Sequence, residues 1–495
     1  MIVLHLRYYH FLYLRSMQKD TFFTSFNEVF LLSCILIAFL LFSAGFNSLD
    51  REYGWDEAVF YSQVRKDVPN LKWHESRSKG LSWLIIPSAI DKDGPESIRW
   101  YLLFLNTIFF IILIWVYQKL LGSWIYLFGF IYSCHYLSIC YSSEIVGNYL
   151  FASLFTISVG SILLYKRNSN DNYLLLASIA GILAMNIRFG DGIIPYFFLT
   201  GLFFVKSLKT ANFSFKGFDF KILSTYLLIL FIGSLSFILQ SFEFDGLADS
   251  LLVTYEQKSS FASPINNLKL LFENYSKERD FSDIDNLIGI AFFIIFFLAF
   301  LYKSLRNEDK VSKELYLWYF APYIISFCIT YGILLHYVEP RHMPMLTIAI
   351  LIPFSQLLKE TFTKKSSINY LSKLLLILLL STYLWNNFSI SRNFLKSHPN
   401  SVQENISKKI SEIPTFKRNE SVVIVDRAVN PAGVQVWLKT KVIDLRSARK
   451  DCEIFEKHDN IIFAGRSSRL RNYIKCNYNL NVYTSDRFTI YSYKK

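Results

Sequence analysis

Long apolar runs constrain this chain more than any other feature of its sequence. About eleven of them follow one another, separated by polar segments. They are centred on residues 28–46, 98–118, 121–140, 145–165, 172–187, 191–205, 222–240, 286–302, 314–335, 343–358 and 370–388. A helix needs about 20 apolar residues to cross roughly 30 Å of hydrocarbon, and most of the runs approach that length. The pattern predicts a polytopic α-helical membrane protein with about 11 transmembrane helices.

Composition excludes the main alternatives. The 495 residues are 52% hydrophobic and only 18% charged, and the mean hydropathy is +0.29. Disordered, collagen-like and disulfide-rich chains differ strongly from these values. The formal net charge of +13 is compatible with nucleic-acid binding, but much of the positive charge lies in short loops between apolar runs. Orientation in a bilayer explains that distribution better, so no nucleic-acid partner is expected.

Lysine and arginine in the loops predict the orientation. With a cytoplasmic N-terminal segment at 1–27, five loops join it on the cytoplasmic side, and together they carry roughly 18 basic and 8 acidic residues. The opposite side carries roughly 14 basic and 21 acidic residues. The cytoplasmic loops contain Lys119, Lys166–Arg167, Lys206–Lys221, Lys303–Lys313 and Lys359–Lys373. We expect the first run to stay as an anchor, because it follows about 27 residues without a clear small-residue cleavage site.

An odd number of spans places residues 389–495 outside the cytoplasm, after a transmembrane domain at 28–388. Short β-branched runs at 422–425, 442–443 and 461–463, with a helical segment at 432–439 after Pro431, predict a small α/β domain there. Cys452 and Cys476 lie in this domain and can pair if it faces an oxidising compartment, which the sequence leaves open. The cysteine and histidine spacing suggests no metal site, and we assign no metal and no cofactor.

Ionisable residues gather at the external ends of the predicted spans. The first external loop, 47–98, contains the acids Asp56 and Glu57, followed by Tyr61 and Lys79. The other external turns carry Glu144, Arg188, Arg341 and His342. Each alone has an ordinary explanation, such as interfacial polarity, snorkelling or a local ion pair. Charged groups at the edge of a bilayer usually line a protein cavity, and their common side favours one shared site.

These residues resemble the GT-C glycosyltransferases that use polyprenyl-phosphate-linked sugars. The likeness is to the branch of protein O-mannosyltransferases and lipid A aminoarabinose transferases, and it covers roughly residues 28–390. It rests on Asp56-Glu57, on Lys79 in Ser-Lys-Gly-Leu-Ser-Trp, on Glu144, and on Pro340-Arg341-His342. Gly80 stands where the family has proline, Glu144 where several relatives have aspartate, and His342 where tyrosine is common. These departures leave the sugar open.

The chemistry of such a transfer suits these residue types. An attacking hydroxyl must lose its proton to a nearby carboxylate, and we expect Asp56 to be that general base. Glu57 and Glu144 can orient the acceptor or stabilise positive charge on the sugar. Lys79, Arg341 and, as a weaker candidate, Arg188 suit the departing phosphate. Tyr61 and His342 are possible substrate contacts.

The sequence therefore predicts a GT-C-like glycosyltransferase, with a polyprenyl-phosphate-linked sugar as donor. A second external loop, 241–284, is long enough to cover a cavity. The acceptor can be a lipid, a glycan or a protein, and a bacterial inner membrane is the expected location. Two alternatives remain: a lipid-linked saccharide transporter or flippase, with charges near the membrane midplane, and a non-catalytic envelope-assembly subunit.

Overall fold

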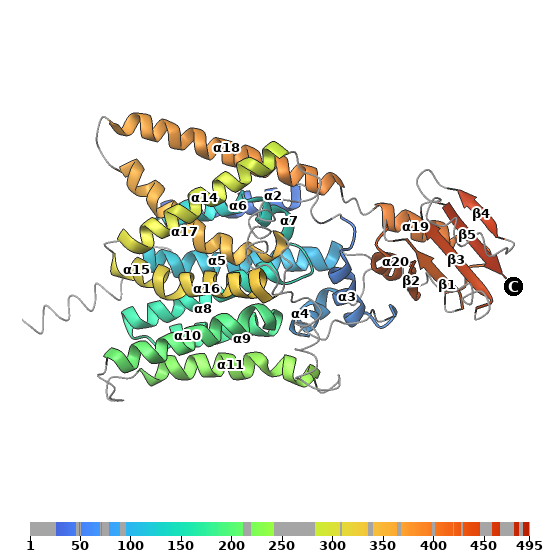
Figure 1. Ribbon diagram of the computed structural model, residues 1–495, viewed down its shortest axis with the longest axis horizontal. Helices are drawn as coiled ribbons and strands as arrows, with labels where there is room; N and C mark the ends of the chain where they lie inside the picture. Colours follow the sequence, from blue (N-terminus) through green and yellow to red (C-terminus); the bar gives the residue numbers. More distant parts are fainter. Residues whose placement is uncertain are drawn as a thin grey trace, which may run out of the picture.

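The protein consists of a helical bundle joined at one end to a small sheet domain (Figure 1). The computed structural model describes residues 26–45, 49, 51–69, 71, 79–89, 96–210, 219–241, 283–306, 309–334, 340–363, 368–397, 401–418, 420–426, 429–445, 458–465, 480–484 and 489–494. Most of the N-terminal segment 1–27 and most of the loop 241–284 lie outside these residues, as do Cys452 and Cys476.

Within the described residues, eight helices are long and apolar enough to cross a membrane, which confirms the predicted polytopic helical class. They are α2 (Phe26–Gly45), α5 (Glu96–Leu121), α8 (Asn148–Asn168), α10 (Phe189–Thr210), α11 (Phe220–Ser241), α14 (Asp283–Arg306), α17 (Pro344–Thr363) and α18 (Ile368–Ser397). The apolar helix α9 (Asn172–Ile187) is shorter. A single non-helical residue, Arg188, separates α9 from α10, so this break is narrower than the three residues expected from the sequence.

The predicted single span at 121–140 is wrong. The chain forms two short helices there, α6 (Ile125–Ser133) and α7 (Tyr136–Tyr141), with a break at Cys134 and His135. The imidazole of His135 caps α7 by accepting a hydrogen bond from the backbone N–H of Leu137 at 3.1 Å. The backbone N–H of Tyr136 donates to Oδ1 of Asn387 in α18, at 2.8 Å. Side chains thus satisfy the amides that the break frees.

The predicted span at 314–335 is helical as far as Leu334 but irregular. It contains α15 (Lys310–Leu315), a π-helical turn η2 (Tyr316–Phe320), α16 (Ala321–Phe327) and a second π-helical segment η3 (Cys328–Leu334). Pro322 lies at the start of α16 and cannot donate a backbone hydrogen bond. Such π-helical turns often occur near functional sites, and Tyr331 of η3 stacks on His342, the residue after Arg341.

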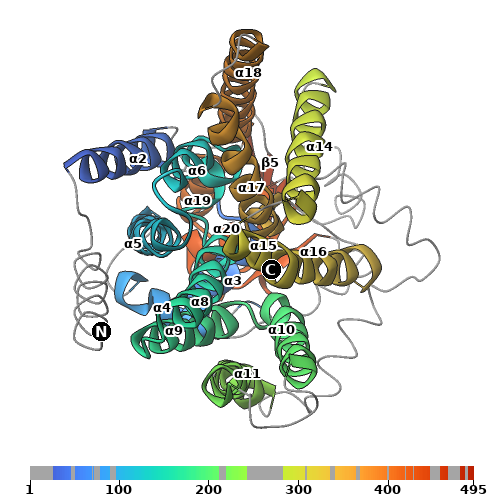
Figure 2. The ribbon, with the colours of Figure 1, turned by 90° about the vertical axis from the view of Figure 1, so that its left-hand side faces the viewer.

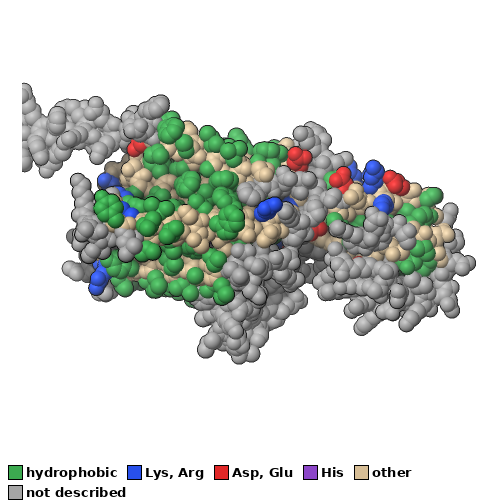
Figure 3. Space-filling view, turned by 90° about the horizontal axis from the view of Figure 1, so that it is seen from above, with side chains coloured by type: hydrophobic (Ala, Val, Ile, Leu, Met, Phe, Trp, Pro, Cys, Tyr) green, Lys and Arg blue, Asp and Glu red, His purple; other side chains and the backbone are tan. Residues whose placement is uncertain are grey.

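The helices form an inner and an outer layer. Viewed along the bundle, α2, α11 and α18 lie near its outside, while α8 and α17 lie further in (Figure 2). The apolar stretch of α8 is 94% buried and that of α17 is 72% buried, whereas that of α2 is only 22% buried. On the face seen in Figure 3, hydrophobic side chains cover the middle of the bundle, as expected for contact with lipid.

Lysine–glutamate pairs lie at one end of the bundle. At the end marked by α15, Lys166 and Lys206 both pair with Glu314, at 2.9 and 3.1 Å. Lys303 pairs with Glu360 at the same end. The other end carries two short helices, α3 (Trp55–Val64) and α4 (Gly80–Ala89), and adjoins the sheet domain (Figure 1). The basic loops and the candidate site therefore lie at opposite ends, and which end faces the cytoplasm stays a prediction.

The C-terminal domain is an α/β unit, as predicted. It contains α19 (Ser401–Ser411), β1 (Val422–Val425), α20 (Pro431–Leu438), β2 (Val442–Asp444), β3 (Asn460–Gly465), β4 (Asn481–Thr484) and β5 (Thr489–Lys494). The strand order is β2-β1-β3-β5-β4, with β1 parallel to β2 and β3, and β5 antiparallel to β3 and β4. One core lies between the sheet and α19 and α20, where Ile406, Val423 and Val434 pack together.

Candidate active site

Helix α3 holds the two acids of the loop 47–98. The helix begins after Gly54, so Asp56 and Glu57 both lie in its first turn. The backbone N–H of Gly54 donates to Oε2 of Glu57 at 2.9 Å, which closes a capping interaction. Both carboxylates also benefit from the positive end of the helix dipole. The two adjacent side chains then point into different surroundings, which gives them different chemistry.

Glu57 is buried among cations and hydrogen-bond donors. Its carboxylate lies 2.9 Å from Nη2 of Arg99 and 3.5 Å from Nη2 of Arg51. It also accepts a hydrogen bond from the backbone N–H of Ile145 at 3.0 Å. Burial by itself raises the pKa of Glu57, but the charges of Arg99 and Arg51 outweigh that effect and lower the pKa to about 2. Glu57 therefore stays ionised.

Arg99 anchors the segment that precedes α3. This residue of α5 is completely buried. Besides Glu57, its guanidinium donates to the backbone carbonyls of Leu49, Arg51 and Glu52, at 3.0, 2.6 and 3.1 Å. One side chain thus satisfies three carbonyls and one carboxylate. A buried guanidinium is tolerated only with such complete pairing, so Arg99 fixes how α3 enters the bundle.

Asp56, Glu144 and Arg341 come together, as the sequence predicted. Nη2 of Arg341 lies 2.9 Å from Oδ2 of Asp56, and Nη1 of Arg341 lies 3.9 Å from Oε1 of Glu144. Oε1 of Glu144 is also 3.5 Å from Nη2 of Arg51. The side chains of Asp56 and Arg341 keep 12% and 16% of their surface exposed, whereas that of Glu57 keeps 1%. Of the two acids in α3, Asp56 is therefore the more accessible.

Arg188 forms a second pair beside this cluster. Its Nε lies 2.6 Å from Oδ2 of Asp191, in the first turn of α10. The hydroxyl of Tyr331 donates to the other carboxylate oxygen of Asp191. The ring of Tyr331 stacks on His342, with centroids 5.0 Å apart. Arg188 and Asp191 therefore contact, through Tyr331, the residue that follows Arg341.

Lys79 lies at the same end of the bundle. It precedes α4, and its carbonyl accepts a hydrogen bond from the backbone N–H of Trp83 at 3.0 Å. Its neighbour Gly80 packs directly on the last turn of α9. A Cβ added to Gly80 would lie 2.2 Å from the carbonyl oxygen of Asn186, so no side chain fits. This close approach explains glycine at a position where the resemblance implies proline.

We expect Gly80→Ala to destabilise the protein, because backbone atoms cannot yield as a flexible side chain can. Overpacking of this kind costs about 1–3 kcal/mol, and a thermal unfolding scan in detergent would measure it as a lower melting temperature. Gly201→Ala in α10 is the matched control, since nothing lies within 4 Å of a Cβ there. Equal melting temperatures for the two variants would contradict the proposed close contact.

Tyr61 faces the protein interior instead of the acid–arginine cluster. It is 1% exposed, and its ring centroid lies 5.5 Å from that of Tyr53. The guanidinium of Arg65 lies over the Tyr61 ring, at 5.8 Å. These contacts are typical of packing within α3 and its flanking segment. The prediction that Tyr61 contacts substrate therefore gains no support from its position.

Three residues near the site were missed in the sequence, Arg51, Arg99 and Tyr331, and Asp191 was given no role there. Arg99 opens an apolar run, where arginine usually marks an interface with lipid headgroups. Asp191 stands three residues after Arg188, a spacing that brings side chains together on one helix face and could have identified the pair. Within the described part of the chain, no three histidine, cysteine, aspartate or glutamate side chains form a group suited to a metal ion.

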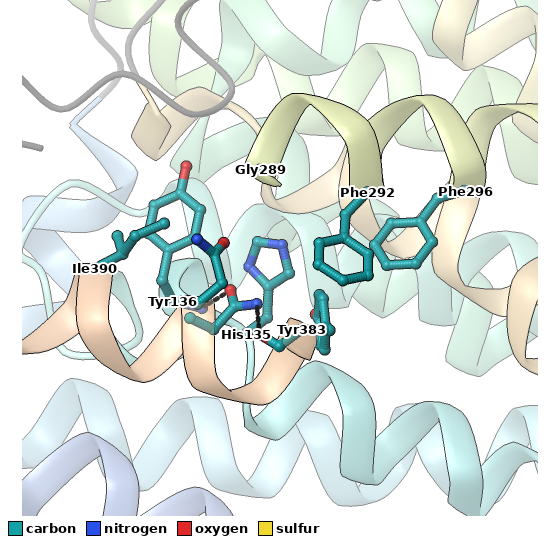
Figure 4. Close-up of a pocket in the computed structure, with 9 residues that line it drawn as sticks. His135, Tyr136, Gly289, Phe292, Phe296, Tyr383 and Ile390 are labelled. Carbon is teal, nitrogen blue, oxygen red and sulfur yellow. Dashed lines mark hydrogen bonds between the residues drawn. The ribbon is translucent and has the colours of Figure 1, made fainter. Parts of the chain in front are cut away.

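A separate pocket lies between α14, α18 and the break that separates α6 from α7 (Figure 4). Phe292 and Phe296 of α14 form an aromatic wall, and His135 and Asn387 contribute polar groups. The side-chain amide of Asn387 makes two hydrogen bonds. Its Nδ2 donates to the carbonyl of Tyr383 at 2.8 Å, and its Oδ1 accepts from the backbone N–H of Tyr136. The polar residues of this pocket thus stabilise the broken helix.

The protein thus combines a bundle of apolar helices, a small α/β domain and an acid–arginine cluster. Its fold is similar to that of a solved membrane protein, ArnT. The similar solved structures include ArnT from Cupriavidus metallidurans bound to undecaprenyl phosphate, with a TM-score of 0.63. The same ArnT in the apo state gives 0.62. Each is 10% identical to this chain, and each match covers 94% of this chain and 97% of the other. No protein-family model and no curated protein matches by sequence.

Proposed function

We propose that the protein is an integral-membrane glycosyltransferase that transfers a sugar from a polyprenyl-phosphate-linked donor to an envelope lipid, glycan or protein. The carrying observation is the cluster of Asp56, Glu144 and Arg341, which places a partly accessible carboxylate beside a guanidinium. The cluster lies at the end of the bundle opposite the lysine-rich loops. The ArnT structure that contains undecaprenyl phosphate supports the class of donor.

In the proposed reaction, the acceptor hydroxyl attacks the anomeric carbon from the face opposite the phosphate. The bond from that carbon to the phosphate oxygen breaks, and its electron pair leaves with the polyprenyl phosphate. The proton of the hydroxyl passes to Asp56, so one carboxylate is sufficient for an inverting displacement. Arg341 stabilises the growing negative charge on phosphate through a bidentate pair, and Lys79 is proposed as a second cation.

Donor binding is also proposed to change the basicity of Asp56, because Asp56 is paired with Arg341. Without donor, the guanidinium neutralises the carboxylate at 2.9 Å. A bound phosphate competes for the same guanidinium, so Asp56 becomes a stronger base when donor is present. Glu57, which is held by Arg99, Arg51 and Ile145, is proposed to position α3 instead of touching substrate. Arg188 is proposed to support His342 through Asp191 and Tyr331.

We expect Arg341→Ala to weaken binding of the donor carrier. Hydrogen bonds to a charged group contribute about 1.5–3 kcal/mol, which corresponds to a roughly 10–150-fold higher Kd. Titration of purified protein with undecaprenyl phosphate in detergent would measure the change. Arg392→Ala is the control, because Arg392 is an exposed arginine near the C-terminal end of α18. Equal affinity of the two variants would remove Arg341 from the proposed phosphate site.

The function itself is tested by incubating the protein with radiolabelled polyprenyl-phosphate sugars and a total envelope-lipid extract. Transfer of label by the wild type identifies the enzyme and its donor in one experiment. A folded protein that transfers label from no donor would favour the transporter alternative. That alternative expects charged side chains near the midplane, yet the central helix α8 carries no charged residue before Lys166, in its last turn. A non-catalytic subunit would tolerate loss of Asp56, Lys79 and Arg341 together.

A further inference from the structure

We propose that Gln403, in the C-terminal domain, is a positioning residue for Asp56, an inference that rests on the proposed transferase function. Gln403 lies in α19 and is completely buried. Its Oε1 accepts a hydrogen bond from the backbone N–H of Tyr53 at 3.0 Å, and its Nε2 donates to the backbone carbonyl of Tyr53, also at 3.0 Å. One amide side chain thus pairs with both polar backbone groups of the residue before Gly54.

Further contacts hold both ends of the segment 53–69. At its start, Nδ2 of Asn430 also donates to the Tyr53 carbonyl, at 2.7 Å. At its end, Nε2 of Gln435 donates to the carbonyl of Pro69 at 2.7 Å, and Lys439 pairs with Asp67 at 2.8 Å. Asn430 precedes α20, while Gln435 lies within that helix and Lys439 follows it. The C-terminal domain therefore clamps the segment that contains α3.

Gly433 makes the Gln403 contact possible. A Cβ on Gly433 would lie 2.3 Å from Oε1 and 2.5 Å from Nε2 of Gln403, so the amide crosses α20 where that helix has no side chain. Glycine in a helix interior costs roughly 0.5–1 kcal/mol relative to alanine. The close approach is a physical reason for glycine at this position.

The clamp acts on Asp56 through the backbone. Tyr53 lies three residues before Asp56, and Gly54, between them, is the N-cap of α3. Just before this segment, Arg99 binds the carbonyls of residues 49, 51 and 52. Gln403 and Arg99 thus both hold the residues that lead into α3. A misplacement of about 1 Å in a reacting group can cost 10²-fold in rate. Loss of the Gln403 or the Arg99 contacts is therefore expected to lower the rate by moving Asp56.

Gln403→Met tests this inference, because methionine fills a similar volume without either hydrogen bond. We expect kcat for sugar transfer to fall about tenfold while KM for the donor changes less than twofold. Amide hydrogen exchange at Tyr53 should become faster in the same variant. Gly433→Ala should reproduce both effects, since its methyl group displaces the Gln403 amide. Lys408→Ala, at an exposed position on α19, is the control and should change neither quantity.

The two measurements separate the possible failures. Unchanged exchange at Tyr53 in both variants would show that Gln403 does not hold this segment. Faster exchange with unchanged kcat would show that the clamp exists but does not position the base. A wild type that transfers no sugar would overturn the proposed function and the positioning role together, while the exchange result would still report on the contact itself.

Discussion

Asp56→Asn is expected to lower the rate of sugar transfer by about 10²–10⁴-fold, the usual contribution of a general base. Asparagine has the size of aspartate and can accept a hydrogen bond from Arg341, but it cannot take the proton of the acceptor. The loss should therefore appear in kcat with little change in donor binding. Transfer of labelled sugar from the donor panel, with wild type and variant at equal concentration, would measure it.

Glu96→Gln is the matched control for this substitution. Glu96 is an exposed acid at the start of α5, at the same end of the bundle. It should keep wild-type transfer. The Asp56→Asn protein should also keep the melting temperature of the wild type within a few degrees. Near-normal transfer by a folded Asp56→Asn protein would exclude Asp56 as the base.

Arg99→Met is expected to have the largest effect on stability. Removing one partner of a buried ion pair costs about 3–5 kcal/mol, because the other charge stays buried without its main partner. Here the substitution leaves Glu57 with Arg51 at 3.5 Å, and it also removes the hydrogen bonds to three carbonyls. Thermal unfolding in detergent should show a large drop in melting temperature and low yield.

A surface ion pair provides the comparison. Lys221 and Asp171 lie 2.8 Å apart, but their side chains are 61% and 64% exposed. Exposed pairs contribute about 0–1 kcal/mol, so Lys221→Met should barely change the melting temperature. If the two methionine variants unfold at the same temperature, the buried network of Arg99 and Glu57 does not stabilise the bundle.

The same network gives stability a pH dependence. The pKa of Glu57 is about 2 in the folded protein, compared with about 4.3 for an unperturbed glutamate. A lowered pKa in the folded state stabilises the protein above the unfolded value, and that contribution is lost as the pH falls from about 4.3 toward 2. Glu57→Gln should remove this part of the acid dependence. An identical acid-unfolding profile in the two proteins would contradict the assignment.

Hydropathy predicted most of the fold, because a bilayer leaves few structures open to an apolar segment. The break at Cys134 and His135 could not be predicted in this way. Its stabilising partner, Asn387, lies 251 residues from Tyr136 and gives no local signal. A run of apolar residues therefore looked like one span although the chain bends within it.

Only part of the candidate cluster could be predicted from the sequence. The order and sidedness of Asp56, Glu144 and Arg341 indicated a cluster, and the structure brings them together. Asp56 and Glu57 are adjacent acids that the sequence cannot distinguish, whereas burial and the partners of Glu57 separate them. Arg99 opens an apolar run and therefore resembled an ordinary interfacial anchor. Its true surroundings depend on carbonyls some 50 residues earlier.

The hydrogen bonds between Gln403 and Tyr53 join residues 350 positions apart in the chain. A ribosome therefore makes the segment with Asp56 well before the residues that clamp it. During synthesis, α3 therefore has only its contacts within the bundle until α19 and α20 have emerged and folded. A chain that lacks α19 and α20 would therefore also lack the side chains that hold Tyr53 and Pro69.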